Sequence, residues 1–140
     1  MNLKVYIDTN VYLDAIDNRD KGIAKKVLAF FAQKEIDLYF NDLTIINIHY
    51  IAKKNRTREE ITQILKVILR KQEIVSIDKE IIENALESKF KDFEDGVQYF
   101  CARKIDANLI LTSNKKDFKH SEIKVLSPLE FYDKYIVESL

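Results

Sequence analysis

The sequence predicts an α/β fold in which helices cover a parallel β-sheet. Short runs rich in β-branched and aromatic residues alternate with longer segments whose apolar residues recur every three or four positions. This alternation is typical of βαβ units, in which each helix carries the chain back to the start of the next parallel strand. The chain has 140 residues, of which 46% are hydrophobic, so we expect a single domain spanning residues 1–140.

Five strands are predicted, and two of them are expected to be central. The strands cover Leu3–Ile7, Ile36–Phe40, Glu73–Ile77, Asn108–Thr112 and Ile123–Leu126. The first and the fourth are nearly continuous apolar runs, which is the pattern of strands buried on both faces. These two strands should therefore lie in the middle of the sheet.

Seven helices are predicted between and after these strands. They cover Val11–Ile16, Ile23–Gln33, Leu43–Lys54, Arg58–Arg70, Lys79–Ser88, Phe93–Ile105 and Leu129–Ile136. Thr57 with Glu60, and Ser127 with Glu130, have the spacing of a capping box, in which two side chains satisfy free amides at a helix start. These two pairs give the best-defined helix boundaries.

The overall composition limits the possible functions. Lys plus Arg and Asp plus Glu each number 23, so the net charge gives no reason to expect strong non-specific binding to nucleic acid. The densest basic segment is Lys53–Arg58, for which a solvated helix end is the favoured interpretation over a binding surface. With Cys101 as the one cysteine, no disulfide can form within the chain, and we expect this residue in the core.

The distribution of apolar residues indicates a cytoplasmic protein. The amino-terminal apolar run ends at Asp8, too early for a signal peptide, and no other run approaches the length of a bilayer span. A single cysteine also suits a reducing compartment.

Acidic residues follow the first predicted strand and lie at the start of the helix that precedes the fourth strand. Asp8 comes directly after the first strand, and Asp92 and Asp95 are three residues apart in the first turn of a helix, on one face. Helix capping is an alternative for each, because Asp is a preferred N-cap residue and acids in a first turn suit the helix dipole.

A third polar set, with Asn114 and Asp117, follows the fourth strand. Ligands bind to open parallel sheets in the crevice outside the carboxyl ends of the strands, so all three sets can meet there. Clustered carboxylates repel one another unless a proton or a cation neutralises them. Because oxygen ligands suit Mg²⁺ or Mn²⁺, and such an ion can activate water against a phosphodiester, nucleic-acid hydrolysis is the simplest chemistry.

Four segments of the sequence resemble the PIN domain, specifically the VapC-like toxin ribonucleases. They are Val5–Val11, Asp92–Asp95, Leu111–Phe118 and Val125–Phe131, and the resemblance extends over essentially the whole chain. It implies a three-layer α/β/α sandwich and cleavage of RNA with Mg²⁺ or Mn²⁺ held by clustered acids. It also implies a cognate antitoxin and a homodimer.

The same resemblance assigns roles to individual residues. It makes Asp8 and Asp95 the central metal ligands and catalytic residues, with Asp117 completing the cluster. Asn10 and Asn114 become polar supports, and Asp92 becomes an additional acid. We therefore expect these side chains to lie close together in the folded protein.

The chain departs from the family pattern at Asn47, where a glutamate is usual. Either Asp92 compensates for the lost carboxylate, or metal binding is weaker, or the site has moved away from catalysis. His49 and His120 are interpreted as structural or exposed residues rather than catalytic ones, and His120 is the more weakly placed of the two.

Three functional hypotheses follow. The first is a metal-dependent endoribonuclease that acts as the toxin of a type II toxin–antitoxin pair. The second is a weakened PIN-like module that binds RNA or a protein through Lys53–Arg58. The third is a phosphotransfer enzyme of the haloacid dehalogenase type with Asp8 as nucleophile, which is disfavoured because Asn10 replaces the second aspartate that this mechanism needs.

Overall fold

The structure is a computed structural model that describes residues 3–34, 36–70 and 72–137. Residues 1–2 and 138–140 of the expected domain therefore lie outside the described part. Its elements, in chain order, are β1 (Lys4–Ile7), α1 (Thr9–Ile16), η1 (Asp20–Gly22), α2 (Ile23–Gln33), β2 (Asp37–Asn41), α3 (Asp42–Ala52), η2 (Lys53–Asn55), α4 (Arg58–Leu69), β3 (Gln72–Val75), α5 (Lys79–Glu87), α6 (Phe93–Lys104), β4 (Leu109–Leu111), η3 (Lys115–Phe118), β5 (Lys124–Leu126), α7 (Pro128–Phe131) and η4 (Tyr132–Ile136).

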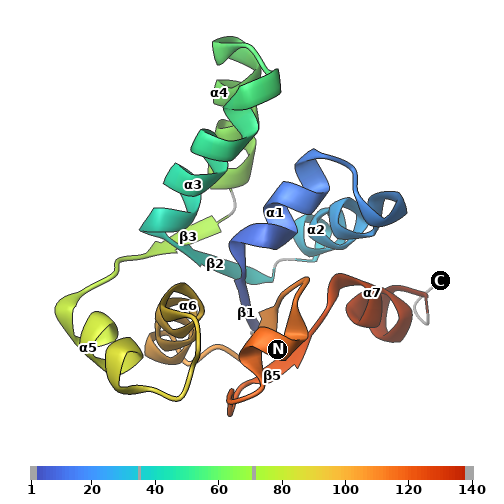
Figure 1. Ribbon diagram of the computed structural model, residues 1–140. Coiled ribbons are helices and arrows are strands. Elements are labelled where there is room, and N and C mark those ends of the chain that lie inside the picture. Colours follow the sequence, from blue (N-terminus) through green and yellow to red (C-terminus); the bar gives the residue numbers. More distant parts are fainter. Residues whose placement is uncertain (1–2, 35, 71, 138–140) are drawn as a thin grey trace.

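The strands form a parallel sheet with the order β3-β2-β1-β4-β5 (Figure 1). This confirms that the first and fourth predicted strands are the central ones. The chain builds the sheet outward from β1 in one direction and then, from β4, in the other. The point between β1 and β4 is therefore the topological switch point, where open α/β sheets bind their ligands.

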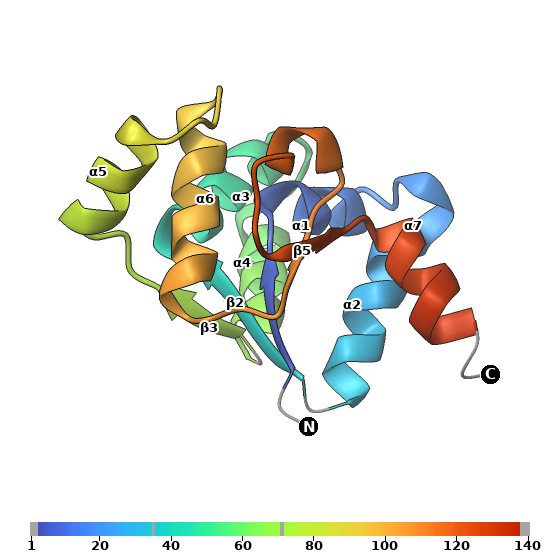
Figure 2. The same ribbon diagram turned by 90° about the horizontal axis from the view of Figure 1, so that it is seen from below.

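The alternation of side chains along β1 divides the core into two layers. Val5 and Ile7 face one way and pack with α1, α2, α3 and α7, whereas Tyr6 faces the other way and packs with α5 and α6. Successive residues of a strand point to opposite faces, so one strand serves both layers. Figure 2 shows α5 and α6 on one side of the strands and α2 and α7 on the other. The three-layer α/β/α arrangement is thus confirmed.

The helix predictions are confirmed, with differences at the boundaries. The helix predicted over Leu129–Ile136 is divided into α7 and the π-helical turn η4, and the one predicted over Leu43–Lys54 ends at Ala52 and continues as η2. Both predicted capping boxes are present: in each, the Thr57 or Ser127 hydroxyl accepts from the amide of the glutamate three residues later, at 3.1 Å.

The arm formed by α3 and α4 extends beyond the sheet (Figure 1). At its far end, Arg56 forms an ion pair with Asp17 at 3.1 Å and donates to the carbonyl oxygens of Ala52 and Ile16. Part of the predicted basic segment therefore holds the arm to α1. In the described residues, no helix is both long enough and apolar enough to cross a bilayer. Cys101 is fully buried, as expected.

Candidate active site

Asp8 lies at the topological switch point because β1 ends immediately before it. Ile7 pairs with Leu111 in the register of β1 and β4, so Asp8 and Thr112 leave the sheet side by side. The Asp8 amide continues the ladder by donating to the Leu111 carbonyl oxygen at 3.0 Å. Asp8 occupies the N-cap position of α1, yet its side chain makes no capping hydrogen bond. The backbone amides of Thr9 and Asn10 nevertheless act to lower the pKa of this carboxylate, so the first turn of α1 contributes to its stabilisation.

Both oxygens of the Asp8 carboxylate accept hydrogen bonds from uncharged side chains. The Gln98 amide donates to Oδ1, and the Thr112 hydroxyl donates to Oδ2 at 2.8 Å. The Tyr6 hydroxyl donates to the Gln98 side-chain oxygen at 3.0 Å. The same hydroxyl accepts a hydrogen bond from the Asn41 side-chain amide at 2.9 Å. Burial raises the pKa of Asp8, and the hydrogen bonds from Thr112 and Gln98 oppose that shift. The network fixes the position of a carboxylate that is 3% exposed.

Asp95 lies in the first turn of α6 in a very different environment. Its pKa is raised from 3.8 to about 7, first by burial and then by the negative charges of Asp92, Asp8, Asp117 and Glu94. Asp8 and Asp117, predicted with Asp95 as metal ligands, thus lie near enough for their charges to act on Asp95, although the three come from separate parts of the chain. A carboxyl group surrounded in this way favours a proton or a cation beside it.

Asp117 is hydrogen-bonded by Asn114, one of the residues predicted as polar supports. The Asn114 side-chain amide donates to Asp117 Oδ2, and the Asn114 backbone amide donates to the Thr112 hydroxyl at 3.1 Å. The same loop is tied to α1, because the Ser113 hydroxyl donates to the buried carboxylate of Asp14 at 2.6 Å. Hydrogen bonds within the loop after β4, and one from the loop to α1, thus hold this segment in place.

A cavity of about 270 Å³ is lined by Asp92, Asp95 and Asp117, but not by Asp8, together with basic residues. Its lining consists of Lys91, Asp92, Asp95, Lys116, Asp117, Lys119 and His120. We call it the acidic cavity. His120, ranked below His49 from the sequence, lines it and meets the Phe90 ring edge-on, with 6.1 Å between ring centroids. The cavity therefore combines carboxylates that suit a cation with cations that suit a phosphate.

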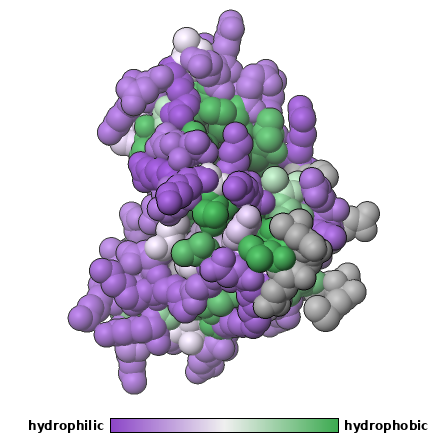
Figure 3. All heavy atoms as spheres, turned by 90° about the vertical axis from the view of Figure 1, so that its right-hand side faces the viewer, coloured by the Kyte–Doolittle hydropathy of each residue, from purple (hydrophilic) through white to green (hydrophobic). Residues whose placement is uncertain are grey.

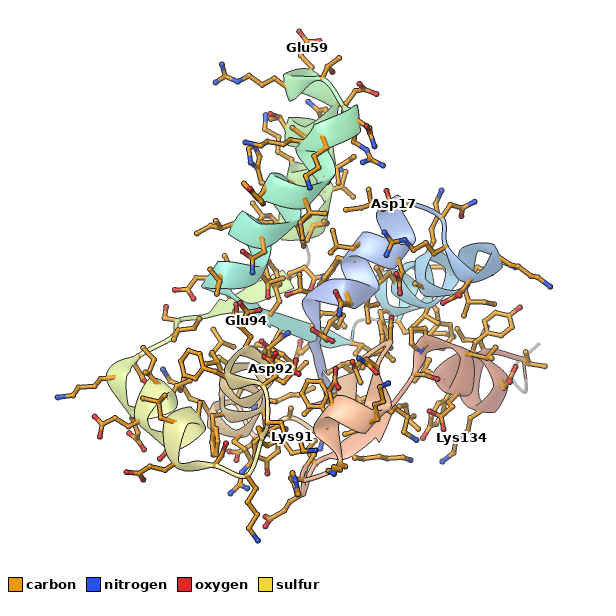
Figure 4. The ribbon with its side chains drawn as sticks, viewed as in Figure 1. Asp17, Glu59, Lys91, Asp92, Glu94 and Lys134 are labelled. Carbon is orange, nitrogen blue, oxygen red and sulfur yellow. The ribbon has the colours of Figure 1, made fainter. Side chains whose placement is uncertain are left out.

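Asn47 lies elsewhere. It lines a neighbouring cavity of about 190 Å³ together with Glu94 and Gln98. The structure thus separates Asn47 from Asp92 and Asp95, which line the acidic cavity. Figure 4 shows Glu94 between the starts of α6 and α3, and Asp92 below it. The acid on the Asn47 side is Glu94, to which the sequence interpretation assigned no role.

Asp92 and Asn10 differ in how far the structure supports their predicted roles. Asp92 is the N-cap of α6, and its Oδ1 accepts from the amides of Glu94 at 2.8 Å and Asp95 at 3.2 Å. Capping is thus one role of Asp92, alongside its place in the acidic cavity. Asn10 is exposed on α1 and lines neither of the two cavities. Its supporting role stays a prediction.

The residues that sequence reasoning missed are the neutral partners of Asp8. Gln98 is three residues after Asp95, hence on the same face of α6, and Thr112 and Asn41 lie at the ends of β4 and β2. Position after a strand was the signal that identified Asp8. Applied to uncharged residues, it would have identified Asn41 and Thr112 as well.

The donor set fits a hard divalent cation. Asp8, Asp95 and Asp117 offer oxygen atoms only, and burial together with the neighbouring acids raises the pKa of Asp95. Within the described ranges, no three His, Cys, Asp or Glu side chains close around one point. Mg²⁺ does not require such a cage, because it keeps several waters and binds proteins through one or two carboxylates plus substrate phosphates.

Comparison with known proteins gives concordant results. Residues 4–116 match the model of the PIN domain family. Ribonuclease VapC1 of Aquifex aeolicus is 30% identical over 139 residues, covering 94% of this chain and 95% of that protein.

Solved structures resemble the fold at lower identity. VapBC2 from Rickettsia felis, bound to a DNA fragment from its promoter, has a TM-score of 0.69 and 16% identity, over 89% of this chain and 98% of the other. A toxin–antitoxin complex from Klebsiella pneumoniae has a TM-score of 0.68 and 23% identity, over 89% and 97%.

Proposed function

Because the chain belongs to the PIN domain family, we propose that it is an endoribonuclease that hydrolyses RNA phosphodiester bonds with Mg²⁺ or Mn²⁺. The observation that carries the proposal is the meeting of Asp8, Asp95 and Asp117, from three separate segments, at the switch point of the sheet. The relation to Ribonuclease VapC1 supports RNA as the substrate.

In this proposal Asp8, Asp95 and Asp117 hold the metal ion, and the other residues position the reactants. When bound, such an ion lowers the pKa of a coordinated water and screens charge that develops on the phosphate. Gln98 and Thr112 keep both Asp8 oxygens in place, and Asn114 does the same for Asp117.

The basic residues of the acidic cavity attract the RNA backbone. Lys91, Lys116 and Lys119 line it beside the carboxylates, where they would attract a phosphate of the substrate. His120 adds a group able to donate a hydrogen bond to a phosphate oxygen.

The proposal includes a cognate antitoxin and a homodimer, as in a type II toxin–antitoxin pair. The relatives include toxin–antitoxin complexes, and the surface offers an apolar cleft of about 320 Å³ between α4 and the pair α1 and α2. Val67, on α4, is 59% exposed at this cleft. Figure 3 shows apolar atoms reaching the surface in the upper half of one face, at the height of α4. An antitoxin segment would cover such a surface.

A binding module without catalysis remains the second candidate, because Asn47 provides no carboxylate where the family pattern has one. Asn47 lines the neighbouring cavity together with Gln98, the residue that donates to Asp8. Three aspartates are retained without it.

The test is cleavage of structured and single-stranded RNAs by the purified protein with Mg²⁺, with Mn²⁺ and with EDTA. We expect metal-dependent cleavage that falls by at least about 100-fold in Asp8→Ala and in Asp95→Asn, because each removes a proposed metal ligand. Asp133→Asn, an exposed site on η4, is the matched control and should cut normally. Full activity of Asp95→Asn would contradict the proposed site, and RNA binding by folded protein without any cleavage would favour the binding module.

A further inference from the structure

The cavity beside Asn47 shares a wall with the Asp8 network. Gln98, which donates to Asp8, lines this cavity, and so does Thr9, the residue that follows Asp8. At about 190 Å³ it is smaller than the roughly 300–1,000 Å³ of sites for drug-sized ligands. It therefore suits one ring system located next to the proposed cleavage site.

Most of the cavity wall is apolar. Leu43, Ile77, Ile82 and Val97 contribute, together with Phe93 at the start of α6. Phe93 is 46% exposed, although it is aromatic and lies beside the acids. An exposed aromatic ring at the edge of an apolar cavity provides a face on which a nucleobase can stack.

Two polar side chains of this cavity have no hydrogen-bond partner in the described part of the chain. They are Asn47 and Glu94, whereas Asn41, Thr44 and Gln98 are all engaged in the network around Asp8 and Tyr6. The amide of Asn47 can donate and accept, and the carboxylate of Glu94 only accepts. An apolar wall with two such free groups fits a flat ligand that carries hydrogen-bonding atoms on its edge.

We propose that this cavity holds one nucleobase of the RNA substrate, stacked on Phe93, with its edge read by Glu94 and Asn47. The inference rests on the proposed function, because the base must belong to the strand whose phosphate lies at Asp8 and Asp95. Single-stranded RNA is commonly recognised through bases that leave the stack and pack on aromatic side chains.

The chemistry of Glu94 selects guanine. The Watson–Crick edge of guanine presents two adjacent donors, N1–H and the N2 amino group, which the two oxygens of one carboxylate can accept together. Adenine and cytosine present one amino group beside an acceptor nitrogen, and uracil presents one N–H between two carbonyl oxygens. The cavity should therefore favour guanine over the other three bases.

The experiment measures binding of short oligouridylates to the full chain in EDTA, where no metal-dependent cleavage occurs. The central residue is uridine, guanosine, adenosine, cytidine or an abasic ribose. Guanosine should bind about 5- to 150-fold more tightly than the abasic ribose, which is the range for a base stacked on an aromatic ring at tenfold per 1.4 kcal/mol. Phe93→Ala should remove most of this difference, and Glu94→Gln should remove the preference for guanosine over adenosine.

Two controls separate base recognition from charge and from lost apolar surface. Glu59→Gln makes the same charge change on the exposed start of α4, and Leu86→Ala removes an exposed apolar side chain on α5. Both should keep the guanosine preference of the unmodified protein. Equal binding of guanosine and abasic oligomers, or an unchanged preference in both cavity variants, would overturn the proposal and leave the cavity to a side chain of a partner protein.

The outcome can be distinguished from failure of the nuclease itself. Metal-dependent cleavage without base preference would overturn the base site and leave the nuclease intact. A second outcome is a base preference that is lost in Phe93→Ala and Glu94→Gln while the protein cleaves no RNA with any metal. This outcome would support the base site and overturn the nuclease.

Discussion

Asp8 and Asp95 belong to one proposed site, but their carboxylates differ in burial, in hydrogen bonds and in the charges around them. Asp8 is 3% exposed and receives hydrogen bonds from Gln98 and Thr112. Asp95 is partly exposed, and its partial burial together with the negative charges of four neighbouring acids brings its pKa to about 7.

The difference shows that fixing the position of a carboxylate and neutralising its charge are separate tasks in this site. Hydrogen bonds from uncharged side chains hold the Asp8 oxygens in place. Among the described residues, no hydrogen bond to the Asp95 carboxylate offsets the effect of its acidic neighbours, and a proton or a cation that joins the cluster would do so. One carboxylate is thus fixed by the fold, and the other is the more responsive to pH and to metal.

The largest effect is expected from removing the link between Asp8 and the core. Gln98→Leu deletes the donor to Asp8 and the acceptor of the Tyr6 hydroxyl, leaving buried polar groups unsatisfied. We expect the free energy of unfolding to fall by about 2–4 kcal/mol, measured by urea denaturation. Gln33→Leu, an exposed site at the end of α2, is the control and should change it by less than about 0.5 kcal/mol. A similarly small change for Gln98→Leu would show that the network contributes little.

A smaller effect is expected from pH, and it should act through Asp95. The pKa of this group is 3.8 when free and about 7 in the folded protein. Between about pH 4 and pH 7 the unfolded chain therefore holds fewer protons than the folded one, so stability falls as pH rises. With allowance for solvent screening of a partly exposed group, the loss should be about 1–2 kcal/mol in EDTA.

Two comparisons test this assignment. Asp95→Asn should lose most of the fall in stability between pH 5 and pH 8, because the neutral amide does not titrate. Mg²⁺ should restore stability to the unmodified protein at pH 8, but much less to Asp95→Asn, since a ligand that binds only the folded state stabilises it. An equal pH dependence in both proteins would assign the titration to other groups.

The positions of two of the acids, Asp8 and Asp117, follow from the topology. Asp8 and Asp117 follow the two central strands, and the carboxyl ends of parallel strands meet at one edge of a sheet. The hydrophobic runs located the strands, so the convergence of these residues could be predicted from the chain alone.

The two cavities could not be predicted in the same way. Asp92 and Glu94 are two residues apart at the start of α6, and which cavity each lines depends on how that helix is rotated against the sheet and α3. Packing decides that rotation, and spacing along the chain does not. The hydrogen bonds among Tyr6, Gln98 and Asn41 were equally hidden, because uncharged residues give no signal of the partner they will find.

The smallest effect concerns two groups of basic residues, at the acidic cavity and at the end of the α3–α4 arm. Lys91→Gln with Lys119→Gln should weaken binding of single-stranded RNA severalfold and make its salt dependence shallower by about 0.7 for each phosphate that no longer meets a lysine. Lys54→Gln with Arg58→Gln removes the same charge from the arm, where Arg56 already serves to hold the arm to α1, and should change the affinity by less than about twofold. Both pairs are measured by titration across a range of salt concentrations. The opposite ranking would locate RNA on the arm and support a binding module in place of the nuclease, because a strand held there has no carboxylate cluster beside it.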